Sequence, residues 1–317
     1  MTGLIGRVDK ALVAALGFIV VLLFGGALYS RNFLSADYLL QQLQVASFLG
    51  VIATGAMVVI LLGHIDLSIP WVVTIGGMMS TAAAGRGGMA GSLAIPFAVA
   101  CGFGFGIVNG LGVAYLRVPS MIFTLGTNAI AQGLMVVHTS GFAPQEFASP
   151  TMHYIAVERS LFGIPNAVWV WAAIGGATVI LLRKTSFGRR VYAIGNSERA
   201  VFLSRGNVNR VVVACFAISG ACSAFAGVLL AGYSTKAYQA MGDPYLLPAI
   251  AAVVLGGTSI LGGRGTYLGT VAGVVLVTLL QSILSIVQMP EAGRQVIYGS
   301  VIILMLLVYG RGQKVVS

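Results

Sequence analysis

The sequence predicts an all-α polytopic membrane protein with about ten transmembrane helices. Of its 317 residues, 58% are hydrophobic and only 8% are charged, whereas a typical soluble domain carries about a quarter charged residues. The few charges leave ten intervals of sixteen or more residues without Asp, Glu, Lys or Arg. A helix needs about 20 residues to cross the hydrocarbon and satisfies its own backbone polar groups, so each interval predicts one span. The intervals are residues 11–30, 38–65, 67–85, 87–116, 118–145, 160–182, 211–235, 244–263, 265–290 and 295–310.

The only long polar passage, residues 183–210, sets the predicted orientation. It holds seven Lys and Arg residues against one acid, Glu198. With the N-terminus in the cytoplasm, 13 of the 18 Lys and Arg residues face the cytoplasm and five face outside, in keeping with the preference of basic residues for cytoplasmic loops. We therefore expect a single transmembrane domain over residues 1–317, with both termini cytoplasmic, a cytoplasmic loop at 183–210 and an external loop at 140–165.

Several other classes of protein are disfavoured by the same sequence. The net charge of +10 could suit nucleic acid, but no polar domain offers a binding surface for it. The nearest approach to a phosphate-binding loop, from Gly257 to Gly262, is followed by Gly263 and Arg264 instead of the required lysine. The three His and three Cys residues have neither metal-ligand spacing nor a catalytic-triad arrangement. We expect no metal site, no cofactor and no enzymatic activity in this chain.

Two weaker spans occupy matching places along the chain. The third span, after Pro70, is rich in glycine, and the eighth, 247–261, begins at Leu247-Pro248 and runs into glycines. Spans two to five and seven to ten would form two pseudo-equivalent halves if these two segments correspond. In transporters, paired short or broken segments of this kind mark a translocation path at the repeat interface, so the two-halves arrangement is our hypothesis.

Small and polar residues within the spans have two kinds of interpretation. Glycines at four-residue spacing, as in Gly102-x3-Gly106 and Gly269-x3-Gly273, favour close helix packing. Asp66 either caps the start of the third span or lies at the inner mouth of a path, and the polar side chains of the fourth and fifth spans either hydrogen-bond between helices or meet a solute. The candidate path residues are Asp66, Asn109, Thr124, Thr127 and Asn128.

Four sequence blocks, taken together, resemble the inner-membrane permease subunits of bacterial ATP-binding-cassette sugar importers, in the family of ribose, xylose and arabinose permeases. The resemblance covers nearly the whole chain, although His64, Pro70 and Arg199 depart from the residues more usual in that family. The blocks are 63–68 (GHIDLS), 109–110 with 118–122 (VPSMI) and 124–127 (TLGT), 195–206 (GNSERAVFLSRG), and 249–259 (AIAAVVLGGTS) with 262–266 (GGRGT).

The resemblance implies a set of partners and a location. It implies two cytoplasmic ATPase subunits or one tandem ATPase, which bind ATP and Mg, a second permease copy or paralogue, and a periplasmic solute-binding protein. The chain would then lie in the bacterial inner membrane and carry a small hydrophilic solute, a monosaccharide by resemblance. Other readings are a stand-alone ion-coupled carrier, which commonly uses a buried acid or histidine, and a permease for nucleosides or another solute.

The resemblance also implies two contact surfaces. The cytoplasmic one is a short coupling helix that docks on the ATPase, although a basic loop could equally anchor to lipid headgroups at about 1 kcal/mol per Lys or Arg. The external segment is either a passive loop or a landing surface for the binding protein, which its charges would steer. The predicted coupling residues are Asn196, Ser197, Glu198, Arg199, Ala200, Val201, Phe202, Leu203, Ser204, Arg205 and Gly206. The predicted docking residues are Glu146, Glu158, Arg159 and Lys236.

Overall fold

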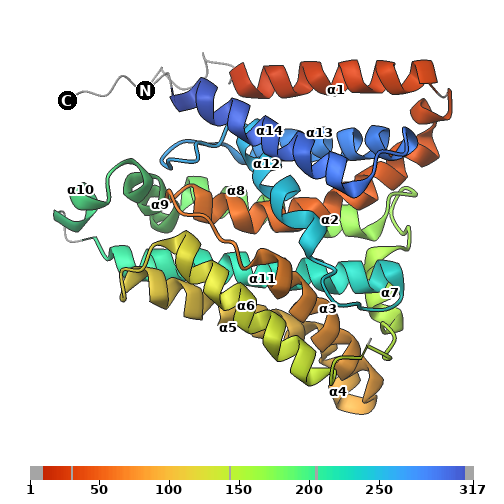
Figure 1. The fold of residues 1–317 in the computed structure, drawn as a ribbon, viewed down its shortest axis with the longest axis horizontal. Coiled ribbons are helices and arrows are strands. Elements are labelled where there is room, and N and C mark those ends of the chain that lie inside the picture. The colour runs from red at the N-terminus through yellow and green to blue at the C-terminus, as the bar shows by residue number, and fades with distance from the viewer. Residues whose placement is uncertain (1–9, 30, 143, 204–205, 311–317) are drawn as a thin grey trace.

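A computed structural model describes residues 10–29, 31–142, 144–203 and 206–310, and over these ranges the chain is a bundle of α-helices with no sheet (Figure 1). The predicted all-α class is therefore confirmed. The helices are α1 (Lys10–Tyr29), α2 (Ala36–Ile60), α3 (Ile69–Gly85), α4 (Gly88–Ser92), α5 (Ala94–Ala114), α6 (Ser120–His138), α7 (Pro150–Ala156), α8 (Asn166–Lys184), α9 (Ser186–Asn196), α10 (Glu198–Leu203), α11 (Val208–Ser234), α12 (Leu246–Leu255), α13 (Tyr267–Ile286) and α14 (Glu291–Gly310), with 3-10 turns η1 (Arg31–Leu34) and η2 (Asp243–Tyr245).

Six helices in the described ranges, α2, α5, α6, α8, α11 and α13, are long and apolar enough to cross a membrane. Shorter apolar helices cover Leu12–Leu28, Ile69–Gly85 and Asp243–Leu255. Each of the ten charge-free intervals overlaps at least one helix. A multi-pass membrane protein is thus supported, while the count of ten spans stays a prediction.

The centre of the bundle is α11, which packs against α5, α3 and α2. The glycine stripe of α5 lies on this contact, because a Cβ added to Gly106 would come within 2.2 Å of the Phe216 carbonyl oxygen. At Gly102 the added atom would come within 2.3 Å of the Ala224 Cβ. Only glycine allows the two backbones to approach this closely, so the helix-packing interpretation of the stripe is confirmed.

A second close contact joins α12 and α13. A Cβ on Gly269 would lie 1.9 Å from the Gly256 carbonyl oxygen, and one on Gly273 would lie 1.9 Å from that of Ala252. The other glycine pair noted in the sequence therefore also serves close packing. The glycine-containing run 256–265 follows the end of α12 and turns through positive φ at Gly257, Gly262 and Gly263.

The two short helices α3 and α12 begin inside the bundle and not at its ends. After α2 the chain runs back toward the middle of the bundle before α3 begins, and α12 follows a similar inward-running segment (Figure 1). Their starts adjoin, because a Cβ on Gly242 would lie 1.9 Å from the Pro70 carbonyl oxygen and the Gly242 N–H donates to the Thr74 hydroxyl at 3.3 Å. Proline in the first turn suits both starts, since its fixed φ is helical and it lacks the N–H that would be unpaired there.

The opposite ends of the bundle carry different elements, with α9 and α10 at one end and α7 at the other (Figure 1). The predicted external loop at 140–165 is more ordered than a plain connection, because it contains α7. This helix packs on α11: Met152 is fully buried, and its carbonyl oxygen would lie 2.4 Å from a Cβ on Gly232. The buried Met152 and Ala156 fix the segment to the bundle.

Candidate translocation path and coupling surface

The buried carboxylate of Asp66 lies in the linker between α2 and α3. Its Oδ1 accepts the backbone N–H of Ser68 at 3.0 Å and the Ser68 hydroxyl at 2.6 Å. Its Oδ2 accepts the Ser219 hydroxyl of α11 at 2.8 Å. Only 4% of Asp66 is exposed. The carboxylate does not cap α3 directly, because the helix has no side-chain cap hydrogen bond at its N-cap, Ser68. It holds Ser68 itself and joins the start of α3 to α11.

The network continues from Ser68 into α5 and α6. The Asn109 amide donates to the Ser68 hydroxyl at 2.7 Å, and its oxygen accepts the Thr127 hydroxyl at 2.6 Å. Asn109 is fully buried and Thr127 nearly so. A buried amide needs both a donor and an acceptor as partners, and Asn109 has both here. These contacts connect α3, α5, α6 and α11 through one continuous chain of hydrogen bonds.

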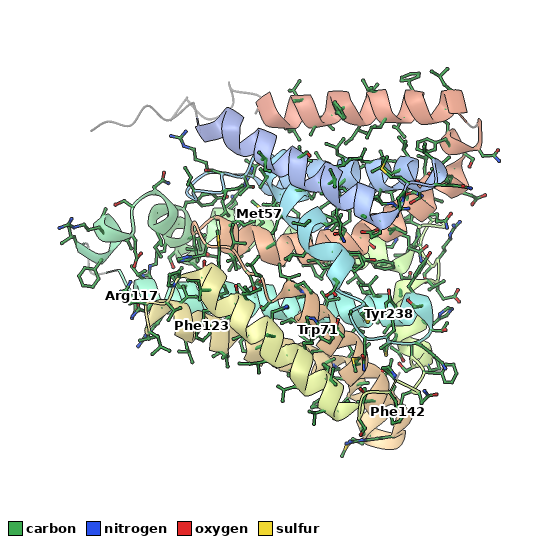
Figure 2. The ribbon with its side chains drawn as sticks, viewed as in Figure 1. Met57, Trp71, Arg117, Phe123, Phe142 and Tyr238 are labelled. Carbon is green, nitrogen blue, oxygen red and sulfur yellow. The ribbon has the colours of Figure 1, made fainter. Side chains whose placement is uncertain are left out.

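The remaining two predicted path residues bind the backbone of the same linker and helix start. The Leu67 N–H donates to the Thr124 hydroxyl at 2.9 Å, and the Trp71 N–H donates to the Asn128 side-chain oxygen at 3.3 Å. Figure 2 places Trp71 in the interior of the bundle. Because α3 begins inside the protein, its first N–H groups cannot reach water, and side chains of α6 satisfy them.

All five predicted path residues therefore meet at one place, the break between α2 and α3. We call the set Asp66, Ser68, Asn109, Thr127 and Ser219 the polar clasp. Sequence reasoning did not select Ser68 or Ser219. Ser219 had no distinguishing signal, because a serine in an apolar helix usually bonds to its own helix, and only the fold brings it to a carboxylate 153 positions away.

The loop at 183–210, which the sequence predicts to be cytoplasmic, contains two helices, α9 and α10, where the sequence predicted one short helix. Thr185 starts α9 by accepting the Gly188 N–H, and Val191 and Ile194 bury its apolar side. Burial raises the pKa of Tyr192 in α9 above its ordinary value, partly offset by the charge of Arg183. A tyrosine that keeps its proton is a hydrogen-bond donor, and the Tyr192 hydroxyl donates to the Gly265 carbonyl at 3.0 Å.

The second helix, α10, displays an apolar surface. Val201 is buried, whereas Phe202 is 69% exposed and Leu203 is 75% exposed. Glu198 at its start pairs with Arg117 at 2.7 Å, which ties α10 to the loop before α6. Figure 2 shows Arg117 at this end of the bundle.

The other predicted coupling residues surround this helix. The Ser197 hydroxyl accepts the Ala200 N–H at 3.2 Å, and Arg199 and Ala200 are exposed. The Gly206 N–H donates to the Val201 carbonyl at 2.9 Å. Ser204 and Arg205 lie outside the described residues.

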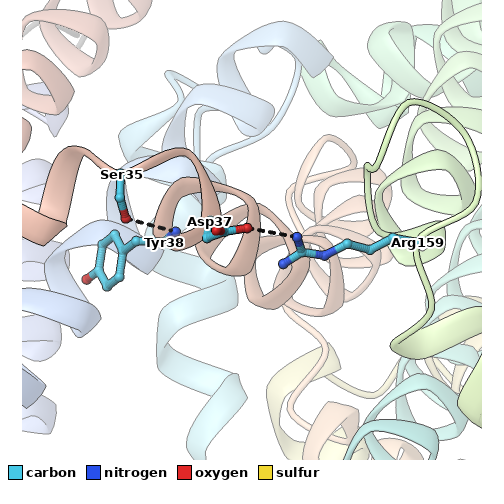
Figure 3. A network of polar contacts seen from close by, with 4 residues as sticks. All are labelled: Ser35, Asp37, Tyr38 and Arg159. Carbon is cyan, nitrogen blue, oxygen red and sulfur yellow. Dashed lines mark hydrogen bonds and ion pairs between the residues drawn. The ribbon is translucent and has the colours of Figure 1, made fainter.

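The predicted external docking residues fall into two pairs. Glu158 and Arg159 are exposed beside α7, and Arg159 pairs with Asp37 of α2 at 3.1 Å (Figure 3). Near that ion pair the Ser35 hydroxyl accepts the Tyr38 N–H and caps α2 (Figure 3). The structure keeps all these groups at the surface.

Glu146 and Lys236 form the second pair. The Lys236 ammonium lies 4.1 Å from the centre of the Phe147 ring, and Phe147 and Lys236 form an isolated antiparallel bridge. The neighbouring Glu146 is exposed, with its side chain against Gly85 at the end of α3. The contacts between Phe147 and Lys236 fasten the segment before α7 to the segment after α11.

A bundle of apolar helices, two of them starting internally beside a buried polar chain, belongs to the class of multi-pass membrane transport proteins. The residues 38–306 match the family described as branched-chain amino acid transport system, permease component. The chain belongs to this family of permease subunits.

Individual relatives match over almost the full length. The ribose import permease protein of Haemophilus influenzae is 31% identical over 311 residues, which cover 95% of this chain and 94% of that protein. The ribose import permease protein of Bacillus subtilis is 34% identical over 296 residues, 92% and 89% of the two chains. An autoinducer 2 import system permease protein of Yersinia enterocolitica is 30% identical over 314 residues, 96% and 83%. No solved structure matches the chain.

Proposed function

We propose that this chain is the transmembrane subunit of an ATP-binding-cassette importer for a small hydrophilic solute, in the first place a monosaccharide. The observation that carries the proposal is the similarity, over more than nine-tenths of the chain, to proteins named as ribose import permeases. A polyhydroxylated solute needs closely spaced donors and acceptors along an apolar bundle. The polar clasp and the neighbouring Thr124 and Asn128 offer that chemistry.

The path in this proposal runs along the break between α2 and α3. Each member of the polar clasp bonds to another member, so the conformation described is closed at this level. Opening toward one side exchanges these internal bonds for bonds to solute hydroxyls and water, and closure restores them. Alternating access then requires only that α3 and its linker move relative to α5, α6 and α11.

The partners in this proposal rest on the similarity to import permeases, and the two ends of the bundle offer surfaces for them. Two ATPase subunits, or one tandem ATPase, bind ATP and Mg and act on residues 196–206. A periplasmic binding protein docks near Glu146, Glu158, Arg159 and Lys236. A second permease copy or paralogue completes the transmembrane unit.

The proposed topology places the chain in the bacterial inner membrane with ten spans in two halves and both termini in the cytoplasm. Charged residues are paired near both ends of the bundle, Glu198 of α10 with Arg117 and Asp37 at the start of α2 with Arg159, which fits a chain that crosses the membrane between these ends. The short helices α3 and α12, which correspond in the two halves, meet at Pro70 and Gly242.

The test is ribose uptake into proteoliposomes that contain the chain, its ATPase and its binding protein. We expect uptake that requires ATP and the binding protein. Uptake by the purified chain alone, driven by an ion gradient, would establish a stand-alone carrier and reject the proposal.

A second solute is favoured by one observation, the similarity to an autoinducer 2 import permease at 30% identity. The same assay with labelled autoinducer 2 in place of ribose separates the two solutes. Uptake of autoinducer 2 without uptake of ribose would assign the autoinducer and leave the importer mechanism in place.

A further inference from the structure

Three glycine-containing segments that are far apart in the sequence meet in one junction beside α9. They are the end of α2 at 61–63, the end of α9 at 195–196, and the connection between α12 and α13 at 261–265. We call this contact the glycine junction. A Cβ on Gly195 would lie 2.0 Å from the Leu61 carbonyl oxygen and 2.4 Å from the Gly263 nitrogen. Backbone therefore lies directly on backbone at this point.

Hydrogen bonds close the same contact. The Gly263 N–H donates to the Leu61 carbonyl at 2.9 Å. The Asn196 amide nitrogen donates to the Gly263 carbonyl at 3.1 Å and to the Tyr192 carbonyl at 2.7 Å. The Tyr192 hydroxyl adds a bond to the Gly265 carbonyl. The end of α9 is thus bonded to the connection before α13, which is itself bonded to the end of α2.

Few residues other than glycine fit the backbone conformation of the junction. Gly63, Gly262 and Gly263 have φ values of 82°, 88° and 74°, a region that residues with a Cβ rarely adopt. A Cβ on Gly262 would also lie 2.7 Å from the Gly63 nitrogen. Where backbone packs directly on backbone, the contact is hardly compressible, so a displacement of one segment is transmitted to the next.

The junction lies between the two functional regions. On one side, only Ser197 separates Asn196 from α10, with its exposed Phe202. On the other side, Leu61 begins the linker that carries Asp66 and leads into α3.

We propose that the glycine junction transmits displacement of α10 to the α2–α3 linker, and that Asn196 is a positioning residue that holds this junction together. This inference rests on the proposed importer function. A push on α10 rotates or shifts α9, the Asn196–Gly263 bond carries the shift to the α12–α13 connection, and the shared contact at Leu61 delivers it to the linker. The polar clasp opens or closes in response.

The test compares two substitutions that add the same charge to the same cytoplasmic loop. Asn196→Asp removes the amide donor to the Gly263 carbonyl. Asn207→Asp keeps the cap of α11, because the Asn207 side-chain oxygen accepts the Arg210 N–H and aspartate accepts equally well. Both variants are reconstituted with the ATPase and the binding protein, and solute imported per ATP hydrolysed is measured at equal amounts of assembled complex.

We expect Asn196→Asp to import several-fold less solute per ATP while its ATPase subunits remain bound and active, and Asn207→Asp to match the wild type. If Asn196→Asp fails to assemble, Tyr192→Phe decides the question, because it removes a single hydroxyl from the same junction and should lower the ratio in the same direction. A wild-type ratio in the assembled Asn196→Asp complex, or in Tyr192→Phe where that variant decides, overturns the inference alone. A wild-type complex that imports nothing with ATP overturns the proposed function, and this inference with it.

Discussion

Replacing Asp66 tests the polar clasp through two substitutions with opposite expectations. Asp66→Ala removes the acceptor of three hydrogen bonds. The hydroxyls of Ser68 and Ser219 can turn to other acceptors, but the Ser68 N–H is fixed by the backbone. A buried donor left without a partner costs about 1–3 kcal/mol. Asp66→Asn keeps an oxygen for Ser68 and an amide for the Ser219 oxygen, and it relieves the cost of a buried charge.

The expected result is a loss of about 1–3 kcal/mol in the free energy of unfolding for Asp66→Ala and no loss for Asp66→Asn. The measurement is unfolding in mixed detergent micelles followed by circular dichroism. Equal stability of Asp66→Ala and the wild type would refute the hydrogen-bonding account. An equally large loss in both variants would show instead that the charge itself stabilises the clasp.

Three further experiments test other contacts with the same unfolding measurement. Gly106→Ala places a Cβ 2.2 Å from a carbonyl oxygen of α11 and should lower the free energy of unfolding by about 1–3 kcal/mol. In the control Gly104→Ala the added Cβ meets nothing within 4 Å, so this change should stabilise α5 by about 0.5–1 kcal/mol. Equal effects of the two substitutions would contradict the packing of α5 on α11. Thr127→Val leaves a buried amide oxygen without its donor and should cost about 1–3 kcal/mol, and an unchanged stability would remove it from the clasp. The exposed pair Arg117–Glu198 should show a coupling of about 0.2–1 kcal/mol in a double-mutant cycle, decreasing with salt, and a salt-independent coupling would contradict its exposure.

The helical class and the places of the helices could be predicted from the sequence, because charges are so costly in hydrocarbon that their absence marks the candidate spans. The close packing at Gly106 was also predictable from the spacing of small residues. The positions at which α3 and α12 start within the bundle could not be predicted in this way. Composition locates apolar segments, but it does not say that a helix begins inside the bundle.

The candidate site was predicted in its residue types but not in its connections. Asp66 and Asn109 stand out because polar groups in apolar spans are few. Their link through Ser68, and the bond from Ser219, depend on the crossing of four helices that no local pattern encodes. The same holds for the bond from the Asn196 amide to the Gly263 carbonyl, because only the fold brings these two positions together.

The central claim is that the ATPase acts on α10, and an acidic substitution of its exposed phenylalanine tests this most directly. Phe202 is 69% exposed on α10, and Phe162, 90% exposed in the segment after α7, provides a matched control. The measurement is recovery of the ATPase with the purified permease variant, followed by ATP-dependent ribose uptake. We predict that Phe202→Asp loses the ATPase and the uptake, while Phe162→Asp retains the ATPase. Full recovery of the ATPase and full uptake with Phe202→Asp would contradict the claim.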